Sequence, residues 1–432
     1  MKKLLIGAAA LALIGIGAAA LAQTINVPQV TQIGPTDLFQ DVVAGTPQAG
    51  NVYVPALLLG NYGATQPGNN AENWLIGGDA TTNLFQRATT GSSVTTTITY
   101  GGPDRWAYWS GTSTTMTVSQ DTTAADLRPG YKAAFKMART SGQTGVVQMC
   151  MMQEIESVNS YMFQGQTAEV DFDAVTGANF SPASGNMVVY FISGTGTDQG
   201  VSTAAFNLNA GGGGSSLWTG QVNTGVTVSL GGGASTSGRY SVVAPIPSTA
   251  TELAIALCYT PVGTAGTNDY VALGNIQATR NSALTTVAGA AGAALNANDA
   301  RAKSFSRRSQ ALESVLQYRY YYQLTETAAI TPVAPCSAVD TTHTNCLVQF
   351  PVAMRAAPTL TYANGFASPT STTQATLGAC TTLASAATVT STVANPLNVL
   401  VNCTATTIPA AGVASFLYSN NGSGTIKATA EL

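Results

Sequence analysis

The stretch VVQMCMMQEIESVNSYMFQGQTAEVDFDAV, residues 146–175, holds two apolar runs separated by a polar segment. Each run, Val146–Ser157 and Ala168–Val175, is rich in β-branched, aromatic or other large apolar residues, and each predicts a β-strand. Within the second run, Val170, Phe172 and Ala174 alternate with carboxylates, so a strand would place the two sets on opposite faces.

Runs of the same kind continue on both sides of this stretch, separated by Gly, Asn, Ser and Pro. They are Ser92–Tyr100, Thr114–Gln120, Met187–Ser193, Gly225–Leu230, Gly238–Ala244 and Glu252–Tyr259. Many short strands at this spacing predict an antiparallel β-sandwich, and the length of residues 73–281 suits a jelly roll.

The remaining segments differ in composition. Residues 23–72 are interrupted by prolines and predict an extended N-terminal segment that packs on something else. Residues 282–324 begin as an Ala/Gly-rich linker and continue as a helix, because Leu312, Val315, Leu316 and Arg319 recur at helical spacing. Residues 325–432 return to Thr-rich strands and predict a smaller C-terminal β domain. The expected fold is therefore mostly β, with one linking α-helix between two β domains.

The first 22 residues have the layout of a secretory signal peptide. Lys2 and Lys3 precede an apolar run that ends in small residues, which places cleavage before Gln23. A retained anchor helix is the alternative, because the run approaches the ~20 residues that span a bilayer. The signal predicts an exported protein, extracellular or virion-associated.

Export would bring the six cysteines into an oxidising compartment, where disulfides form. We predict disulfides Cys336–Cys346 and Cys380–Cys403, because an even set of cysteines in a loop-rich exported region favours pairing. The alternative for these four is that they are small buried apolar residues. Cys150 and Cys258 lie in apolar runs, and they either pair across neighbouring strands or remain buried thiols.

Low charge excludes several classes of function. Charged residues are 9% of the 432-residue chain, against about 25% in an ordinary domain. With 17 Lys and Arg and a net charge of -3, the chain lacks the basic face of a nucleic-acid binder. The densest positive charge lies before and within the expected helix, at Arg301, Lys303, Arg307 and Arg308, and we interpret it as a solvated helix face.

Three alternating carboxylates, Glu169, Asp171 and Asp173, are the strongest candidates for chemistry. They are compatible with glycoside hydrolysis or a structural calcium ion, but we interpret them as the solvent-exposed face of an antiparallel strand. Glu154 and Glu156 receive the same interpretation. The single histidine, His343, follows Asp340 in a polar segment and is expected on a surface loop. We predict no catalytic residue, no metal ligand and no cofactor, with structural calcium left open.

Aromatic residues suggest where a sugar would bind. In RWAYW, a strand would place Trp106 and Tyr108 on one face, where core packing is expected, and Trp109 on the other. Trp218 follows a Gly-rich loop. Trp109 and Trp218 are our candidate carbohydrate-binding residues, and burial in the core is an equal alternative for both.

Several phrases together resemble one group of proteins, the tail-fibre and virion structural proteins of phages that carry a carbohydrate-binding-type jelly roll and a C-terminal β module. In chain order the phrases are NWLIGGDATTNLFQR (73–87), GGPDRWAYWSG (101–111), the opening stretch, TELAIALCYTP, YVALGNIQ, RRSQALESVLQYRYYYQ (307–323) and VQFPVAMRAAPTLTYANG (348–365). The resemblance implies a non-enzymatic virion component, often a homotrimer.

The leading hypothesis is a non-enzymatic virion or phage-like structural protein, of tail-fibre or surface-decoration type, that binds host surface glycans. The alternative is a secreted bacterial surface adhesin or carbohydrate-binding protein. A glycoside hydrolase rests on the alternating carboxylates alone. Expected partners are copies of the chain and other virion or surface proteins. The tyrosines at 318 and 320–322 either contact such copies or cover the base of the C-terminal domain.

Overall fold

Strand β6 (Thr167–Thr176) explains how the sandwich forms. Its residues Val170, Phe172 and Ala174 point into the main apolar core. On either side β6 pairs with β11 (Tyr270–Arg280) and β9 (Ser237–Pro245), both antiparallel. β6 is thus an interior strand of its sheet.

The structure is a computed structural model that describes most of residues 73–431. Its longest gaps are residues 201–217, 281–293, 296–304 and 386–397, and shorter gaps occur elsewhere. The expected signal peptide (1–22), the N-terminal segment (23–72) and most of the linker, with Arg301 and Lys303, lie outside the described residues.

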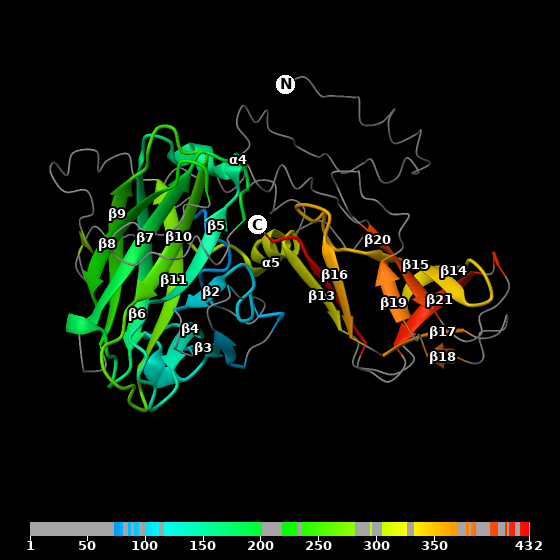
Figure 1. Ribbon diagram of the computed structural model, residues 1–432, viewed down its shortest axis with the longest axis horizontal. Coiled ribbons are helices and arrows are strands. Elements are labelled where there is room, and N and C mark those ends of the chain that lie inside the picture. The colour runs from blue at the N-terminus through cyan, green and yellow to red at the C-terminus, as the bar shows by residue number, and fades with distance from the viewer. Residues whose placement is uncertain are drawn as a thin grey trace, which may run out of the picture. The chain divides into compact units, whose positions relative to one another are not determined.

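Two antiparallel sheets form the sandwich (Figure 1). The first contains β6, β9 and β11 in the order β1-β3-β4-β11-β6-β9-β12, and the second has the order β2-β5-β10-β7-β8. The other bounds are β1 Ser92–Val94, β2 Ala107–Ser110, β3 Met116–Asp121, β4 Ala134–Arg139, β5 Met149–Ile155, β7 Asn186–Gly194, β8 Val222–Ser229, β10 Glu252–Tyr259 and β12 Ala294–Leu295. Strands β4 to β7 alternate between the two sheets, and so do strands β8 to β11, whereas β3–β4 and β7–β8 are neighbours within one sheet. The predicted fold class, mostly β with an antiparallel sandwich, is confirmed.

The sandwich core lies between these sheets. Trp106, Tyr108, Phe135 and Phe172 are buried in it, which confirms the core assignment of Trp106 and Tyr108. A second apolar cluster lies on the opposite face of the five-stranded sheet and contains Cys150 and Cys258. These two cysteines are directly opposite each other in β5 and β10 and form a disulfide.

Short helices connect parts of the sandwich and lead out of it. They are η3 (Ala124–Asp126), α4 (Ser157–Ser160), η4 (Tyr161–Phe163), η5 (Ala183–Gly185) and α5 (Gln310–Tyr318). Ser309 caps α5, since its Oγ accepts the N–H of Leu312 at 3.3 Å. The expected helix extended to residue 324, but β13 (Tyr321–Thr325) begins soon after α5 because its tyrosines pair with a distant strand.

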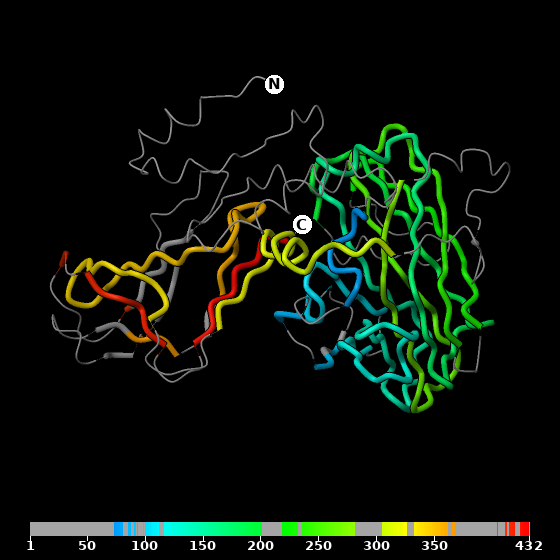
Figure 2. The backbone as a smooth tube through the Cα atoms, turned by 180° about the vertical axis from the view of Figure 1, so that it is seen from behind, coloured from blue at the N-terminus to red at the C-terminus, as the bar shows by residue number. Residues whose placement is uncertain are grey.

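The C-terminal residues build two further sheets. The first, β13-β22-β16, runs as three adjacent antiparallel strands (Figure 2). The second has the order β18-β17-β21-β14-β15-β20-β19. Bounds are β14 Pro332–Ala338, β15 His343–Gln349, β16 Thr359–Ala363, β17 Phe366–Pro369, β18 Leu377–Ala379, β19 Thr382–Ser385, β20 Asn398–Thr404, β21 Ala414–Ser419 and β22 Thr425–Thr429.

The C-terminal sheets share their own apolar core, which includes Val348, Leu417 and Ile426. The predicted disulfide between Cys336 and Cys346 joins neighbouring β14 and β15. Of the other predicted pair, Cys380 and the side chain of Cys403 lie outside the described residues. Residues 71–432 form one compact unit. Among the helices that the structure describes, none has the length and apolar character needed to cross a bilayer.

Candidate functional site

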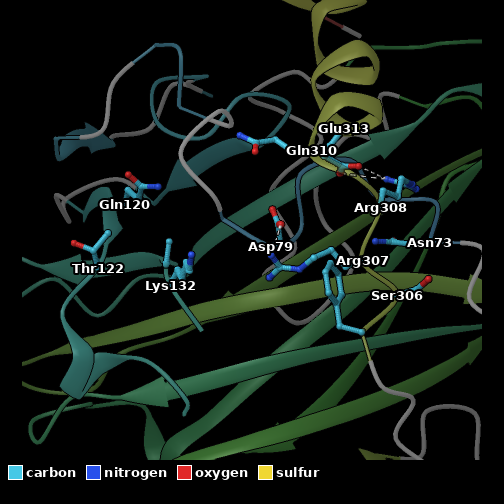
Figure 3. A pocket seen from close by; sticks show the side chains of 12 residues that line it. Asn73, Asp79, Gln120, Thr122, Lys132, Ser306, Arg307, Arg308, Gln310 and Glu313 are labelled. Carbon is cyan, nitrogen blue, oxygen red and sulfur yellow. Dashed lines mark hydrogen bonds and ion pairs between the residues drawn. The ribbon is translucent and has the colours of Figure 1, made fainter. Parts of the chain in front are cut away.

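A polar pocket of about 270 Å³ lies beside the first turn of α5 (Figure 3). Asp79 lies near its centre, with Lys132 and Arg307 on different sides. The lining residues come from the loop before the sandwich, the end of β3, the loop before β4 and the start of α5. They are Asn73, Asp79, Gln120, Thr122, Lys132, Ala133, Phe305, Ser306, Arg307, Arg308, Gln310 and Glu313.

One wall of the pocket is fixed by hydrogen bonds between α5 and the loop at residues 73–80. Arg308 Nη1 lies 3.0 Å from Glu313 Oε2 and 2.9 Å from the carbonyl oxygen of Leu75. The Gly77 N–H also donates to the Glu313 carboxylate. Charge-assisted bonds of this kind hold side chains in defined positions, so this wall is already built without a ligand.

The opposite groups are held less tightly. Arg307 Nη1 lies 3.8 Å from Asp79 Oδ2, and the Arg307 side chain is 54% exposed. Lys132 is also exposed. Gln120 anchors itself through its Nε2, which donates to the Ala80 carbonyl oxygen at 3.0 Å. The pocket therefore presents two accessible cations, Lys132 and Arg307, together with the fixed amide of Gln120.

The pocket's lining suits a ligand that carries many hydroxyl groups. Gln120 and Gln310 supply amides, Thr122 and Ser306 supply hydroxyls, and half-buried Phe305 supplies an apolar ring. Convergent polar groups beside an apolar surface are typical of small-molecule sites. Sequence reasoning noticed only the arginines and interpreted them as a solvated helix face. That interpretation is wrong for Arg308, which is paired with Glu313.

The sequence-predicted sugar residues lie elsewhere. Trp109 is 8% exposed and Trp218 is 4% exposed, and both pack in the apolar cluster on the outer face of the five-stranded sheet. Stacking on a sugar requires an open ring face. Of the two equal alternatives for Trp109 and Trp218, this burial favours core residues over carbohydrate-binding residues.

The three alternating carboxylates of β6 are buried, so their interpretation as a solvent-exposed face is wrong. Polar side chains of the neighbouring strands hydrogen-bond to all three. Ser241 Oγ donates to Glu169 at 3.0 Å, Gln277 Nε2 donates to Asp171 at 3.0 Å, and Asn275 Nδ2 donates to Asp173 at 2.8 Å.

Charge and burial affect these carboxylates differently. Asp173 pairs with Arg239 at 3.3 Å and with Arg128. Burial, reinforced by the nearby Glu169, raises the pKa of Asp171 to about 6. Each carboxylate interacts with side chains of a neighbouring strand, so these contacts hold the sheet together. No two of these three carboxylates are left accessible to a substrate as a hydrolytic pair.

Glu154 and Glu156 are also buried, against the same expectation. Glu156 pairs with Arg319 at 3.3 Å. Neither carboxylate oxygen of Glu154 has a hydrogen-bond partner among the described residues. Burial, only partly opposed by Arg105, raises the pKa of Glu154 to about 8.

His343 lies at a hairpin, where it begins β15. Its Nδ1 is 2.8 Å from Asp340 Oδ2, and its N–H donates to Asp340 Oδ1 at the same distance. Hydrogen bonds from Thr342, followed by those from His343, lower the pKa of Asp340 to about 2. These local contacts shape the turn, which agrees with the expected surface position.

A structural calcium ion was left open by the sequence. Within the part of the chain that the structure describes, no group of three or more His, Cys, Asp or Glu side chains is placed to hold a metal ion.

Comparisons with known proteins complete the description of the site. No family model and no curated protein matches the chain. A similar solved structure is the enzymatically active domain of tailspike protein 4 from bacteriophage CBA120, with 12% identity and a TM-score of 0.27 over 47% of this chain and 22% of that one.

Two carbohydrate-binding modules are similar as well. A family 11 module from a Clostridium thermocellum cellulosomal cellulase has 8% identity and a TM-score of 0.26 over 45% of this chain and 96% of the module. A mannan-recognising module has 12% identity and a TM-score of 0.21 over 40% of this chain and 89% of the module. These TM-scores are low, so we infer neither fold nor function from them.

Proposed function

We propose that the chain is an exported, non-enzymatic structural protein of the virion or phage type, in a tail fibre or surface decoration, and that it binds surface glycans through the pocket beside α5. The observation that carries glycan binding is the pocket's lining, which contains amides, hydroxyls and the half-buried ring of Phe305. Such a lining can hydrogen-bond sugar hydroxyls while the ring packs against the apolar face of a sugar.

A structural role is supported by how the chain uses its few charges. Arg105 is buried and pairs with Glu431 at 2.8 Å, while Arg139 is buried and pairs with Asp269 at 2.8 Å. The Arg139 guanidinium also donates to the carbonyl oxygens of Gln143, Gly145 and Gly263. These charges tie distant segments together, as a load-carrying scaffold requires.

A secreted bacterial adhesin is the second candidate, and the disulfides favour it. Cys150–Cys258 and Cys336–Cys346 are both formed. Disulfides persist mainly in oxidising compartments outside the cytosol. An adhesin that is secreted through such a compartment acquires them on its normal route.

Glycan binding by the full chain tests the proposal. We expect retention on a glycan array and unchanged glycan masses after long incubation. The variant Phe305→Ala should lose most of the binding, while Trp109→Phe, outside the pocket, should keep it. Release of smaller sugars would contradict the non-enzymatic assignment. Equal binding by both variants would contradict the proposal that the glycan binds in this pocket.

Peptide mapping separates the two candidate contexts. Recovery of the chain from purified particles supports the virion protein, and recovery from culture supernatant without particles supports the adhesin. We also propose a homotrimer, for which light scattering of the full chain is the direct measurement. A monomer at high concentration would contradict it.

A further inference from the structure

The charges around the pocket are unequal. Its lining contains three cations, Lys132, Arg307 and Arg308, and two carboxylates, Asp79 and Glu313. The whole chain has a net charge of -3, so a local excess of positive charge is a departure from its surroundings. The question is which of these charges remain available to a ligand.

Two of these five charged side chains, Arg308 and Glu313, form an ion pair with each other. Arg308 Nη1 lies 3.0 Å from Glu313 Oε2, and the same nitrogen donates to the Leu75 carbonyl oxygen. Glu313 in turn accepts the Gly77 N–H. This pair forms the wall of the pocket, and its charges cancel.

The other three side chains, Lys132, Arg307 and Asp79, together carry one excess positive charge. Arg307 approaches Asp79 at 3.8 Å, which exceeds the length of an N–H···O hydrogen bond. Its guanidinium therefore keeps donors for another acceptor. Lys132 is exposed, and no carboxylate of the described residues forms an ion pair with it.

Both cations line the same pocket. Lys132 comes from the loop before β4 and Arg307 from the segment before α5, and Figure 3 shows them on different sides of Asp79. A guanidinium binds a carboxylate or sulfate through two parallel hydrogen bonds, while an ammonium acts as a point charge.

We propose that this pocket selects glycans that carry an acidic sugar, with Lys132 and Arg307 binding its anionic group. The inference rests on the proposed glycan binding and specifies the ligand. Gln120, Gln310 and Phe305 contact the hydroxyls and the ring of the sugar, so they contribute equally to neutral and acidic glycans. The two cations supply the difference between them.

The test is titration calorimetry of the full chain with a glucuronate-containing oligosaccharide and with its carboxyl-reduced counterpart, which differs only in charge. We expect the acidic form to bind about tenfold more tightly. The preference should weaken as salt rises from about 50 to about 500 mM, because salt screens exposed charges. A sulfated oligosaccharide that binds like the glucuronate form shows that the site reads the charge and not the carboxylate geometry.

Substitutions identify the residues that cause the preference for the acidic form. Lys132→Gln with Arg307→Gln should abolish the preference for the acidic form, so that the acidic and the neutral form bind this variant with equal affinity. Arg280→Gln removes an exposed positive charge at the end of β11, outside the pocket, and should change neither. Equal affinity of the unaltered chain for both forms overturns the acidic selectivity while glycan binding stands. Binding of neither form, nor of any glycan on the array, overturns the proposed function itself.

Discussion

Arg105 and Glu431 form a buried ion pair between residues 326 positions apart in the sequence. The Nη1–Oε2 distance is 2.8 Å, and the side chains are 1% and 5% exposed. Arg87 pairs with the other oxygen of Glu431 at 3.0 Å, and the Arg105 guanidinium lies 3.7 Å from the centroid of the Tyr320 ring. This cluster connects the sandwich to the C-terminal strands, and it explains why Tyr320 is buried within the chain.

Replacing Glu431 with Gln should destabilise the protein. The change removes the salt-bridge partner that Arg105 and Arg87 share, and breaking a buried pair from one side costs about 3–5 kcal/mol. Chemical denaturation of the full chain measures the loss. Asp340→Asn breaks an exposed pair and serves as the control, with an expected change much smaller than that of Glu431→Gln. Equal effects of the two variants would contradict the role given to the buried pair.

Glu154 should make stability fall as pH rises. Its pKa is raised by burial to about 8, so between its unfolded value near 4.5 and pH 8 the folded state holds a proton that the unfolded state has released. Stability is greatest below this window and is lost through it. Glu154→Gln, which mimics the protonated form, should reduce the fall between pH 5 and pH 9 by ~4 kcal/mol.

The measurement is the unfolding free energy of both proteins from pH 5 to pH 9. Asp104 and Asp171, whose pKa values burial raises to about 7 and about 6, contribute a fall of the same sign in both proteins. The difference between the two curves therefore reports Glu154. Parallel curves would mean that Glu154 is ionised in the folded protein throughout.

The two disulfides should contribute unequally. Cys150–Cys258 closes a separation of 108 residues and Cys336–Cys346 one of 10. Loop-closure entropy predicts about 5 kcal/mol for the longer loop and about 3 kcal/mol for the shorter one. Paired Cys→Ala replacements at each bridge, compared by chemical denaturation, measure the two contributions. A larger loss at Cys336–Cys346 would show that chain entropy does not control the difference.

Trp218 should act on stability and not on glycan binding. It is buried in an apolar cluster, so Trp218→Ala should cost about 3–5 kcal/mol while Trp218→Phe costs less. Thermal unfolding measures the loss, and the glycan array measures binding of the folded variants at low temperature. Loss of binding by the stable Phe variant would restore Trp218 as a sugar contact.

The alternation of apolar residues predicted most of the sandwich strands, because each strand has one face in a core, but the run at β4 (Ala134–Arg139) was not among them. The burial of the polar face of each strand was harder to predict. In β6 the carboxylates look like residues that face solvent, but they are buried, and Ser241, Asn275 and Gln277 on paired strands hydrogen-bond to them. Strand partners of this kind are far apart in sequence, so a local pattern does not reveal them.

The pocket was missed for the same reason. Lys132 and Arg307 belong to segments that only the folded chain brings together. The arginines were visible as a cluster of positive charge, but the amides and hydroxyls that complete the site have no local signature. By contrast, Cys336 and Cys346 are near neighbours in sequence, and their pairing was accessible.

The position of Glu431 also sets the order in which the protein can mature. A ribosome releases Arg87 and Arg105 long before it reaches Glu431, since 326 residues separate the second arginine from its partner. The sandwich can assemble its core in that interval, but its two arginines have no counter-charge from this source until synthesis passes residue 431. The connection that Glu431 makes between the sandwich and the C-terminal strands is therefore a late step of biogenesis.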